Sequence, residues 1–296
     1  MLSNKSFLLV DFSNVAYAAF FGAVAESKLD TEKIPLFYNE HVFNFKKRIE
    51  SITRYHGLAE IVYALDRKPK YKYEIYPDYK KGRGKLTCVD GSFFDVRAAC
   101  LEELEKQRAT VIYAEDYEAD DAIASFVAQN FYSETTVVTT DKDLWAILDH
   151  PNVRILNFIK GEYITKQHLR EAFCIKDKHK VITQYLTQYS QIKLWKQLWG
   201  DSGDNIPNAV PRMKKQLLPF IKKSDGTWED FEAKLDYTAL TEKCKTLLKT
   251  AEAQIKINSQ LAHLKYNCTL VEETYQKKPV KIPEVQTDPI SLDGIF

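Results

Sequence analysis

Acidic residues are concentrated at the ends of short apolar runs near the middle of this chain. The segments Glu118-Ala119-Asp120-Asp121 and Asp141-Lys142-Asp143 place five carboxylates within 26 residues. The runs that precede them, 111–114 and 136–139, have the length and the β-branched content of buried strands. Because the carboxyl ends of parallel strands share one edge of an α/β sheet, this pattern predicts that the acids meet there.

Two earlier apolar runs have the same form. Residues 7–10 lead into Asp11 and residues 61–65 lead into Asp66, with amphipathic helices expected around 40–55 and 93–108. Four strand ends that carry acids in the same position favour a metal site over four separate helix caps. Residues 15–25 are nearly all apolar, but such a run is too short to span a bilayer, so we expect a buried helix and no membrane association.

Carboxylates gathered in this way repel one another. Two unit charges about 4 Å apart interact by roughly 4 kcal/mol at an effective dielectric constant of 20. Divalent cations remove the repulsion, and oxygen ligands without nearby Cys or His favour Mg²⁺ over zinc, with Mn²⁺ as a substitute. The alternative for any single acid is a helix N-cap or a first-turn charge.

Basic residues form two islands. Residues 67–85 hold eight Lys or Arg, interleaved with four tyrosines, and residues 212–223 hold five with no acid. The second island follows a glycine-rich turn that carries Asp201 and Asp204. Basic groups bind phosphates and aromatic rings stack on unpaired bases, so these islands suggest a nucleic-acid partner. The alternative is a solvated loop whose tyrosines pack locally.

The cysteine content indicates the compartment. The five cysteines are odd in number and include no C-x-x-C pair, which is typical of reduced thiols in a cytoplasmic protein. The apolar start at residues 7–10 is too short for a signal peptide. With 45% hydrophobic residues in 296, the chain can form one large domain and a smaller one.

Taken in order, these motifs resemble the 5′-nuclease (flap endonuclease) superfamily, in its bacteriophage 5′→3′ exonuclease and RNase H branch. The similarity is greatest to the RNase H of T-even phages. The matching pieces are Val10-Asp11-Phe12-Ser13-Asn14, Leu65-Asp66, Tyr79-Lys80, Glu118-Ala119-Asp120-Asp121, Thr140-Asp141-Lys142-Asp143 and Gly200-Asp201-Ser202-Gly203-Asp204-Asn205. Each motif alone is weak, but their joint occurrence in the order of the superfamily is specific.

The resemblance implies a PIN-like, doubly wound α/β nuclease domain at 1–188, with a helical arch at 67–105. A helical DNA-binding domain with a degenerate helix–three-turn–helix would follow at 189–275, and a flexible tail at 276–296. Two Mg²⁺ ions would be held by nine acids: Asp11, Asp66, Glu118, Asp120, Asp121, Asp141, Asp143, Asp201 and Asp204. All of these except Asp201 would be catalytic together with Lys80, which would contact the scissile phosphate.

The nucleic-acid contacts that the resemblance implies come from both islands. They are Lys72, Tyr79, Lys80, Lys81, Arg83, Lys85, Arg212, Lys214 and Lys215. Two departures from the superfamily stand out. Lys72 occupies a position where an arginine is usual, so the bidentate fork on phosphate is lost. The usual Gly-Ile-Gly hairpin is absent after Ile206-Pro207, so Arg212, Lys214 and Lys215 would hold the duplex instead.

The tail ends in Ile290-Ser291-Leu292-Asp293-Gly294-Ile295-Phe296 after a linker that contains Lys and Pro. Such an end resembles the peptides with which phage replication proteins dock on a sliding clamp, through Leu292, Ile295 and Phe296. A frayed terminus is the alternative. A single-strand-binding protein is a further expected partner, and we expect the nuclease itself to be a monomer.

The expected activity is metal-assisted hydrolysis of phosphodiesters at 5′ ends of DNA or RNA–DNA duplexes, which removes RNA primers and flaps during phage DNA replication. Two alternatives remain. A PIN-type ribonuclease shares the acidic sheet edge, although such domains usually lack the arch and the Asp201–Asp204 turn. An inactive nuclease-like DNA-binding module is the other, although such a module would normally have lost some of the nine acids.

Overall fold

A computed structural model of the chain describes residues 5–26, 38–54, 59–82, 87–88 and 91–275. Its centre is a seven-stranded sheet with the strand order β11-β5-β2-β1-β6-β7-β8. Strands β5, β2, β1, β6 and β7 run parallel, and β11 and β8 pair antiparallel at the two edges. The chain starts in the middle of the sheet and builds outward in both directions, which is the doubly wound topology expected.

The strands are β1 Ser6–Asp11, β2 Glu60–Ala64, β3 Thr87–Cys88, β4 Gly91–Ser92, β5 Thr110–Tyr113, β6 Glu134–Val138, β7 Val153–Asn157, β8 Glu162–Tyr163, β9 Cys174–Lys176, β10 Ile182–Tyr185 and β11 Val271–Thr274. The α-helices are α1 Phe12–Glu26, α2 Tyr38–Arg54, α3 Lys70–Ile75, α4 Phe93–Lys106, α5 Ala119–Gln129, α6 Lys166–Ala172, α7 Gln191–Trp199, α8 Lys214–Ile221, α9 Trp228–Ala233, α10 Glu242–Thr250 and α11 Glu252–Ala262. Three 3₁₀ helices are η1 Asp143–Asp149, η2 Ser202–Asp204 and η3 Tyr237–Ala239.

Strand β1 shows how the sheet separates two hydrophobic layers. Successive side chains of a strand point to opposite faces. Phe7 and Leu9 therefore pack on one face with α5 and η1, whereas Leu8 and Val10 pack on the other with α1, α2 and α4. Because both faces are covered, the central strand β1 is apolar from Phe7 to Val10, as the sequence pattern predicted.

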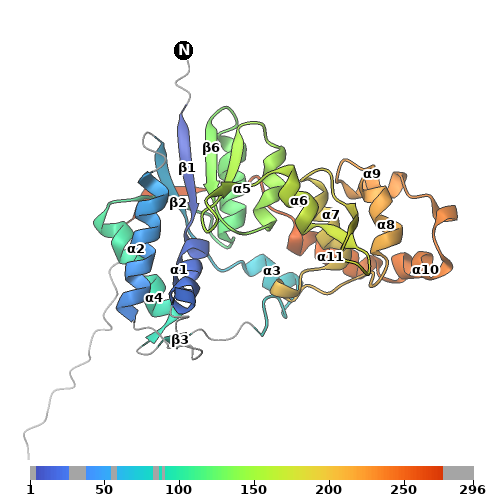
Figure 1. Ribbon diagram of the computed structural model, residues 1–296, viewed down its shortest axis with the longest axis horizontal. Coiled ribbons are helices and arrows are strands. Elements are labelled where there is room, and N and C mark those ends of the chain that lie inside the picture. The colour runs from blue at the N-terminus through green and yellow to red at the C-terminus, as the bar shows by residue number, and fades with distance from the viewer. Residues whose placement is uncertain (1–4, 27–37, 55–58, 83–86, 89–90, 276–296) are drawn as a thin grey trace, which may run out of the picture.

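The first hydrophobic layer continues beyond the sheet into the helices that follow. The same cluster that contains Leu9 of β1 also contains Leu217 of α8 and Phe231 of α9. Figure 1 shows the result, with the sheet and helices α1, α2 and α4 on the left and the helical region α6–α10 on the right. A boundary at residues 188/189 therefore crosses a shared hydrophobic core.

The structure differs from the sequence-based expectations at two places. Residues 271–274 form β11 beside β5, so the segment 189–275 is not wholly helical. The tyrosine-rich segment after Asp66, expected to be a loop, contains helix α3. Its Tyr79 packs with Ile206 and with Leu261 of α11.

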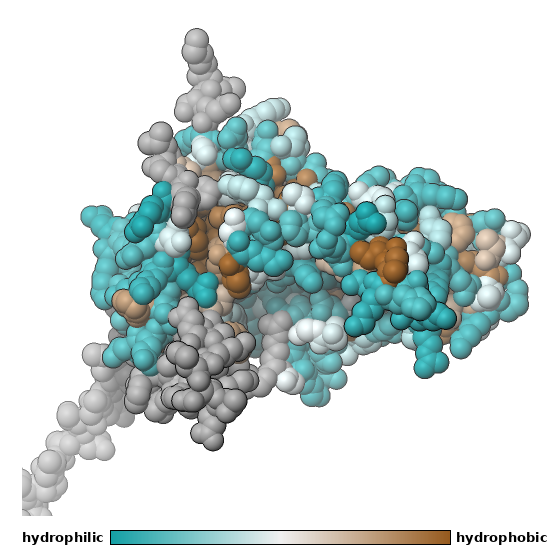
Figure 2. All heavy atoms as spheres, viewed as in Figure 1, coloured by the Kyte–Doolittle hydropathy of each residue, from teal (hydrophilic) through white to brown (hydrophobic). Residues whose placement is uncertain are grey.

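The surface is mainly polar. Figure 2 shows a largely hydrophilic face on which hydrophobic residues gather in small, separate patches. Across the described ranges, no helix combines the length and the apolar character that crossing a membrane requires.

Candidate active site

The carboxyl edge of the sheet opens into a cleft of about 600 Å³. Eight carboxylates line it, and they come from the ends of β1, β2, β5 and β6 and from η2: Asp11, Asp66, Glu118, Asp120, Asp141, Asp143, Asp201 and Asp204. Three basic side chains line the same cleft, Arg67, Lys80 and Arg97. The cleft therefore carries a large excess of acidic groups, at the place where the strand order reverses between β1 and β6.

The acids at the strand ends are held by local hydrogen bonds. Asp11 accepts hydrogen bonds from Thr139 Oγ1 at 2.9 Å and from the backbone N–H of Asn14 at 3.1 Å. Asp66 accepts one from the N–H of Ala119 at 3.0 Å, so it satisfies a donor at the start of α5. Asp66 therefore has both of the roles considered for the acids: it accepts a hydrogen bond from a backbone N–H at the start of a helix, and it lines the acidic cleft.

Burial and mutual repulsion perturb the ionisation of three acids in the cleft. Burial, together with the charges of Asp66 and Asp141, raises the pKa of Asp11 to about 8. Burial and Asp141 raise the pKa of Asp143 to about 7, although Lys196 opposes the shift. The pKa of Asp120 is raised well above its ordinary value by burial and by Asp141 and Asp11. These carboxylates lack enough positive charge around them.

Glu118 is the exception in this cluster. Its Oε2 accepts hydrogen bonds from Lys72 Nζ at 2.6 Å and from the Tyr79 hydroxyl at 2.9 Å, and its Oε1 contacts Lys80 Nζ. Although burial disfavours its charged form, the ammonium groups of Lys72 and Lys80 hold its pKa at about 2. The single Tyr79 hydroxyl proton is shared with Asp204, whose Oδ2 also lies 2.9 Å from the hydroxyl oxygen, so Tyr79 joins two acidic segments.

A second lysine bridges the far side of the cluster. Lys196 of α7 contacts Asp143 and lies 2.5 Å from Oδ2 of Asp201. Burial disfavours its charged form, but these two carboxylates raise its pKa. Lys196 was not among the predicted site residues, since a lysine on a helix normally indicates a solvated face. Its position five residues before Asp201 was the available signal.

Three predicted site residues are buried outside the cleft. Asp121 is buried beneath it, where it accepts hydrogen bonds from the Tyr71 hydroxyl at 3.2 Å and from the N–H of Lys265 at 2.9 Å. Lys72 and Tyr79 were expected to contact nucleic acid, but both are buried. Their polar groups bind Glu118 instead, so the tyrosine-rich segment supports the acid cluster from within the protein.

The second basic island begins next to the acids. A groove of about 480 Å³ runs past Asp143, Asp201 and Lys214. The Lys214 ammonium lies 4.1 Å from the centre of the Trp195 ring. Arg212 is exposed and has a φ angle of +67°, a left-handed conformation that usually falls to glycine, in the segment where the glycine hairpin is missing.

The remaining predicted contacts divide into two groups. Lys81 and Lys215 are exposed, and Lys81 pairs with Asp78 at 2.8 Å. Arg83, Lys85 and the tail residues Leu292, Ile295 and Phe296 lie outside the described residues. Sequence reasoning missed Tyr17, Arg67, Phe94 and Arg97, which also line the cleft. None of the four lies in an acidic signature, and only Arg67 belongs to a basic island.

The donor set of the cleft suits a hard divalent cation. All eight acidic groups offer oxygen, and none of the His or Cys residues whose side chains the structure describes lines the cleft. Within the part of the chain that the structure describes, no three acidic, His or Cys side chains are spaced to hold a metal ion as they stand. Instead, Lys80 contacts Glu118, and Lys196 lies between Asp143 and Asp201. The fit to a metal therefore rests on donor chemistry and on the raised pKa values.

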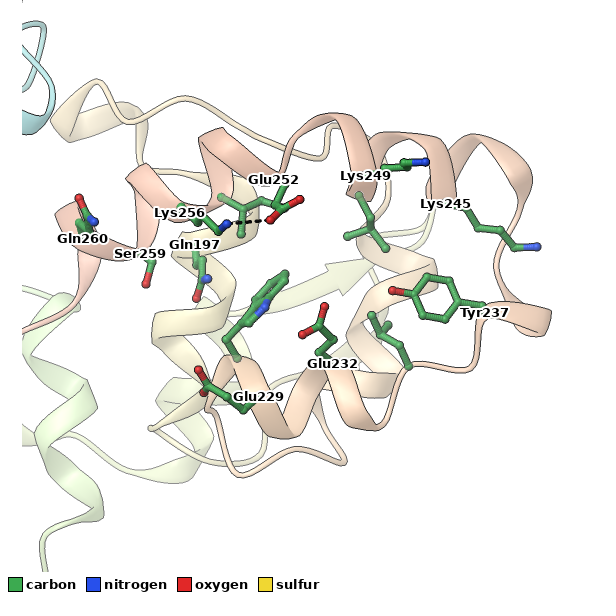
Figure 3. Close-up of a pocket in the computed structure, with 14 residues that line it drawn as sticks. Gln197, Glu229, Glu232, Tyr237, Lys245, Lys249, Glu252, Lys256, Ser259 and Gln260 are labelled. Atoms are coloured by element: carbon green, nitrogen blue, oxygen red, sulfur yellow. Dashed lines mark hydrogen bonds and ion pairs between the residues drawn. The ribbon is translucent and has the colours of Figure 1, made fainter.

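A larger cavity of about 780 Å³ lies between helices α9, α10 and α11 (Figure 3). Its charges balance, with three glutamates against three lysines, and Glu252 pairs with Lys256 at 2.7 Å. It does not gather an excess of one charge, so the acidic cleft is the better candidate for catalysis.

The sheet is doubly wound, its carboxyl edge collects acids from four strand ends, and a basic helical segment lies beside it. This arrangement is the one expected of an α/β nuclease. The family model described as "5′-3′ exonuclease, N-terminal resolvase-like domain" matches residues 6–177. The chain belongs to this family and is a nuclease, that is, a hydrolase of phosphodiester bonds.

Individual relatives agree with this assignment. The chain is 26% identical over 270 residues to DNA polymerase I of Bacillus caldotenax, covering 88% of this chain and 28% of that protein. It is 26% identical over 189 residues to the flap endonuclease Xni of Colwellia psychrerythraea, covering 61% and 62% of the two chains. The chain thus spans less than a third of the DNA polymerase I relatives that it matches.

The fold is also that of a solved structure. The bacteriophage T5 flap endonuclease, in a complex with DNA and metal ions, superposes with a TM-score of 0.62 at 20% identity. The match covers 87% of this chain and 89% of that one. The expected PIN/5′-nuclease-like fold is therefore confirmed.

Proposed function

We propose that this protein is a Mg²⁺-dependent 5′-3′ exonuclease and flap endonuclease of the RNase H type, which acts at 5′ ends, nicks or flaps of DNA and RNA–DNA duplexes. One observation carries the proposal: eight carboxylates from distant segments face one cleft, and three basic side chains of the described residues line it. An uncompensated acidic cleft beside a basic groove suits an enzyme that binds metal ions and a polyanion together.

Two Mg²⁺ ions would be held by the cleft acids, Asp11, Asp66, Glu118, Asp120 and Asp141 for one and Asp143, Asp201 and Asp204 for the other. When bound, such ions activate water and offset the charge of the phosphate. The raised pKa values of Asp11 and Asp143 support this assignment, since both groups lack compensating charge.

The chain's own residues would position the phosphate. Lys80 keeps part of its side chain exposed in the cleft while its ammonium contacts Glu118 and lies 3.8 Å from Asp204. A lysine held in this way presents positive charge at a fixed place, which is the requirement for electrostatic stabilisation. Duplex DNA would follow the groove at Lys214 and the exposed Arg212 and Lys215.

A digest of labelled substrates tests the proposal. Nicked, flapped and RNA-primed duplexes with 5′ labels are incubated with Mg²⁺, Mn²⁺ or EDTA, and the product lengths are read. We expect short 5′ products from all three duplexes with either metal ion and none in EDTA. Cleavage of single-stranded RNA alone would favour a PIN-type ribonuclease, and binding without any cleavage would favour an inactive binding module.

The biological role that we propose is removal of RNA primers and flaps during phage DNA replication in the host cytoplasm. The protein would act as a monomer beside a single-strand-binding protein, with residues 290–296 docked on a sliding clamp. Deletion of these seven residues should abolish stimulation by the clamp and leave activity on free oligonucleotides unchanged. Equal loss of both activities would contradict the docking role.

The division of labour along the chain is part of the same proposal. Residues 1–188 would carry the catalytic centre, with the arch at 67–105, and residues 189–275 would hold the duplex. Because the two parts share one hydrophobic core, we expect them to fold together as one unit.

A further inference from the structure

One wall of the acidic cleft is aromatic and contains Arg97. Helices α1 and α4 contribute Tyr17, Phe93, Phe94 and Arg97 to the lining, whereas Lys80 lines the cleft from the segment after α3. None of these four residues belongs to an acidic motif, and the proposed catalysis uses none of them. The wall is therefore available for another role at the same site.

The start of α4 is rigidly placed. The rings of Tyr17 and Phe93 stack with centres 3.9 Å apart and planes inclined by 13°, and Phe20 packs edge-on against Phe93 at 5.6 Å. Asp95 closes a capping box by accepting a hydrogen bond from the N–H of Ser92 at 2.7 Å. The first turn of α4 is thus fixed by its own cap and by α1, so side chains on that turn are preorganised.

Arg97 differs from the other two basic residues of the cleft. Lys80 is held by Glu118 and Asp204, and the Arg67 Nη1 donates to the carbonyl oxygen of Asp66 at 3.5 Å. The Arg97 guanidinium lies 5.6 Å from the ring centre of Phe12. In the described ranges no carboxylate pairs with Arg97, so its N–H groups can donate hydrogen bonds to the oxygens of a phosphate.

Phe94 is exposed beside this arginine. Its exposed fraction is 73%, whereas that of its neighbour Phe93 is 3%. A large apolar side chain left in solvent at the mouth of a polar cleft is the arrangement expected of a stacking platform for unpaired bases. Phe94 and Arg97 lie three residues apart on one helix, so both face the same side.

We propose that Arg97 binds a substrate phosphate in a bidentate manner and that Phe94 stacks on the base of an adjacent unpaired nucleotide. This inference rests on the proposed function and names a substrate-binding wall within it.

Binding in the absence of a divalent metal tests the arginine. The fluorescence anisotropy of a labelled 5′-flap duplex is measured in EDTA over a range of salt concentrations. Arg97→Ala should raise Kd about tenfold. The plot of the logarithm of the association constant against the logarithm of the salt concentration has a negative slope, and its magnitude should decrease by about one unit. Arg97→Lys should keep the slope but recover only part of the affinity, because the fork is missing.

The chain offers a matched control for this arginine. Arg48 also lies on a helix with its guanidinium near a ring, 6.0 Å from the centre of Phe158, but it does not line the cleft. Arg48→Ala should leave both Kd and the salt slope unchanged.

A stacking probe tests the phenylalanine. 2-Aminopurine placed at successive positions of the unpaired 5′ strand should lose fluorescence on binding at one or two positions. Phe94→Ala should weaken this quenching and Phe94→Tyr should restore it. Phe43, exposed by 54% on α2, supplies the control, because Phe43→Ala should leave the quenching as in the wild type.

The outcomes separate this inference from the proposed function. If the wild type binds and cleaves but Arg97→Ala keeps its affinity and salt slope, the inference is overturned and the nuclease function stands. A fall in melting temperature with an unchanged salt slope would give Arg97 a structural role and also overturn the inference. A wild type that neither binds nor cleaves these substrates would overturn both.

Discussion

The ammonium group of Lys72 lies 2.6 Å from Oε2 of Glu118, and both side chains are almost excluded from solvent, with exposures of 8% and 10%. The same carboxylate binds Tyr79 and Lys80. A basic residue that sequence reasoning assigned to the substrate therefore serves to fix one of the acids of the cleft. The arrangement separates residues that hold the site together from residues that face the substrate.

Removal of the Lys72 charge should destabilise the protein. Lys72→Met leaves Glu118 buried with one ammonium instead of two, and the loss of one partner of a buried pair costs about 3 kcal/mol or more of unfolding free energy. Urea unfolding followed by circular dichroism measures the change. Lys70→Met is the matched control, because Lys70 pairs with Asp116 at the surface and its loss should change stability little. Equal effects from the two variants would contradict the buried role of Lys72.

Removal of a cleft carboxylate should separate cleavage from binding. Asp120→Asn and Asp141→Asn are each expected to lower the single-turnover cleavage rate at least about 100-fold. Substrate affinity in EDTA should stay close to that of the wild type or improve, since one negative charge facing the phosphates is lost. Asp116→Asn, four residues before Asp120 but outside the cleft, should cleave normally. Near-normal cleavage by Asp120→Asn or Asp141→Asn would refute the proposed metal site.

The same Asp120→Asn variant should be more stable than the wild type when no metal is present. Burial and the charges of Asp141 and Asp11 raise the pKa of Asp120, which means that its charged form is disfavoured in the folded protein. An amide removes this cost. We expect a higher melting temperature in EDTA, and a smaller difference between the two proteins when Mg²⁺ is added. A lower melting temperature in EDTA would show that the carboxylates do not repel one another.

The turn that carries Asp201 should depend on Gly200. Gly200 has a φ angle of +66°, and a Cβ there would collide with the backbone carbonyl oxygens of Ile206 and Pro207. Gly200→Ala should therefore cost at least about 2 kcal/mol and reduce cleavage by displacing Asp201. Gly161 has a similar φ angle of +68° but open space around it, so Gly161→Ala should cost only about 1 kcal/mol and leave cleavage intact. Thermal unfolding and the nuclease assay measure the two effects.

Acid should weaken the fold partly through His263. Burial, with smaller contributions from Lys193 and Lys265, lowers the pKa of His263 from its ordinary 6.5 to about 4. Between these two pH values, His263 is protonated in the unfolded chain but stays neutral in the folded chain. The unfolding free energy is therefore unaffected by this group above pH 6.5 and falls as the pH decreases toward 4. Between pH 7 and pH 5 this loss amounts to about 2 kcal/mol.

Two variants isolate that contribution. His263→Gln cannot take up the proton, so its unfolding free energy should fall less than that of the wild type between pH 7 and pH 5. His179→Gln, a change at an exposed position, should retain the wild-type dependence. If all three proteins lose the same stability, the acid sensitivity arises from other groups.

Much of the fold could be predicted because its signals are local. The strands at Asp11, Asp66 and Asp141 each appear as an apolar run followed by an acid, and helix α2 shows a period of 3.6 residues. Strand β11 could not be predicted in this way. This strand has only four residues, which are mostly polar. They adopt strand structure because they pair with β5 at the edge of the sheet.

For the site, the sequence by itself determined which carboxylates exist and that strand topology would bring them to one edge. Only the tertiary structure decided their partners. Tyr79 reaches Asp204 across 125 positions, and Asp121 turns away from the cleft toward Lys265 across 144. Local periodicity indicates which face of an element is buried, but it carries no information about which distant charge lies opposite. That choice depends on packing, since a buried ionisable group is tolerated only where the folded chain supplies a partner.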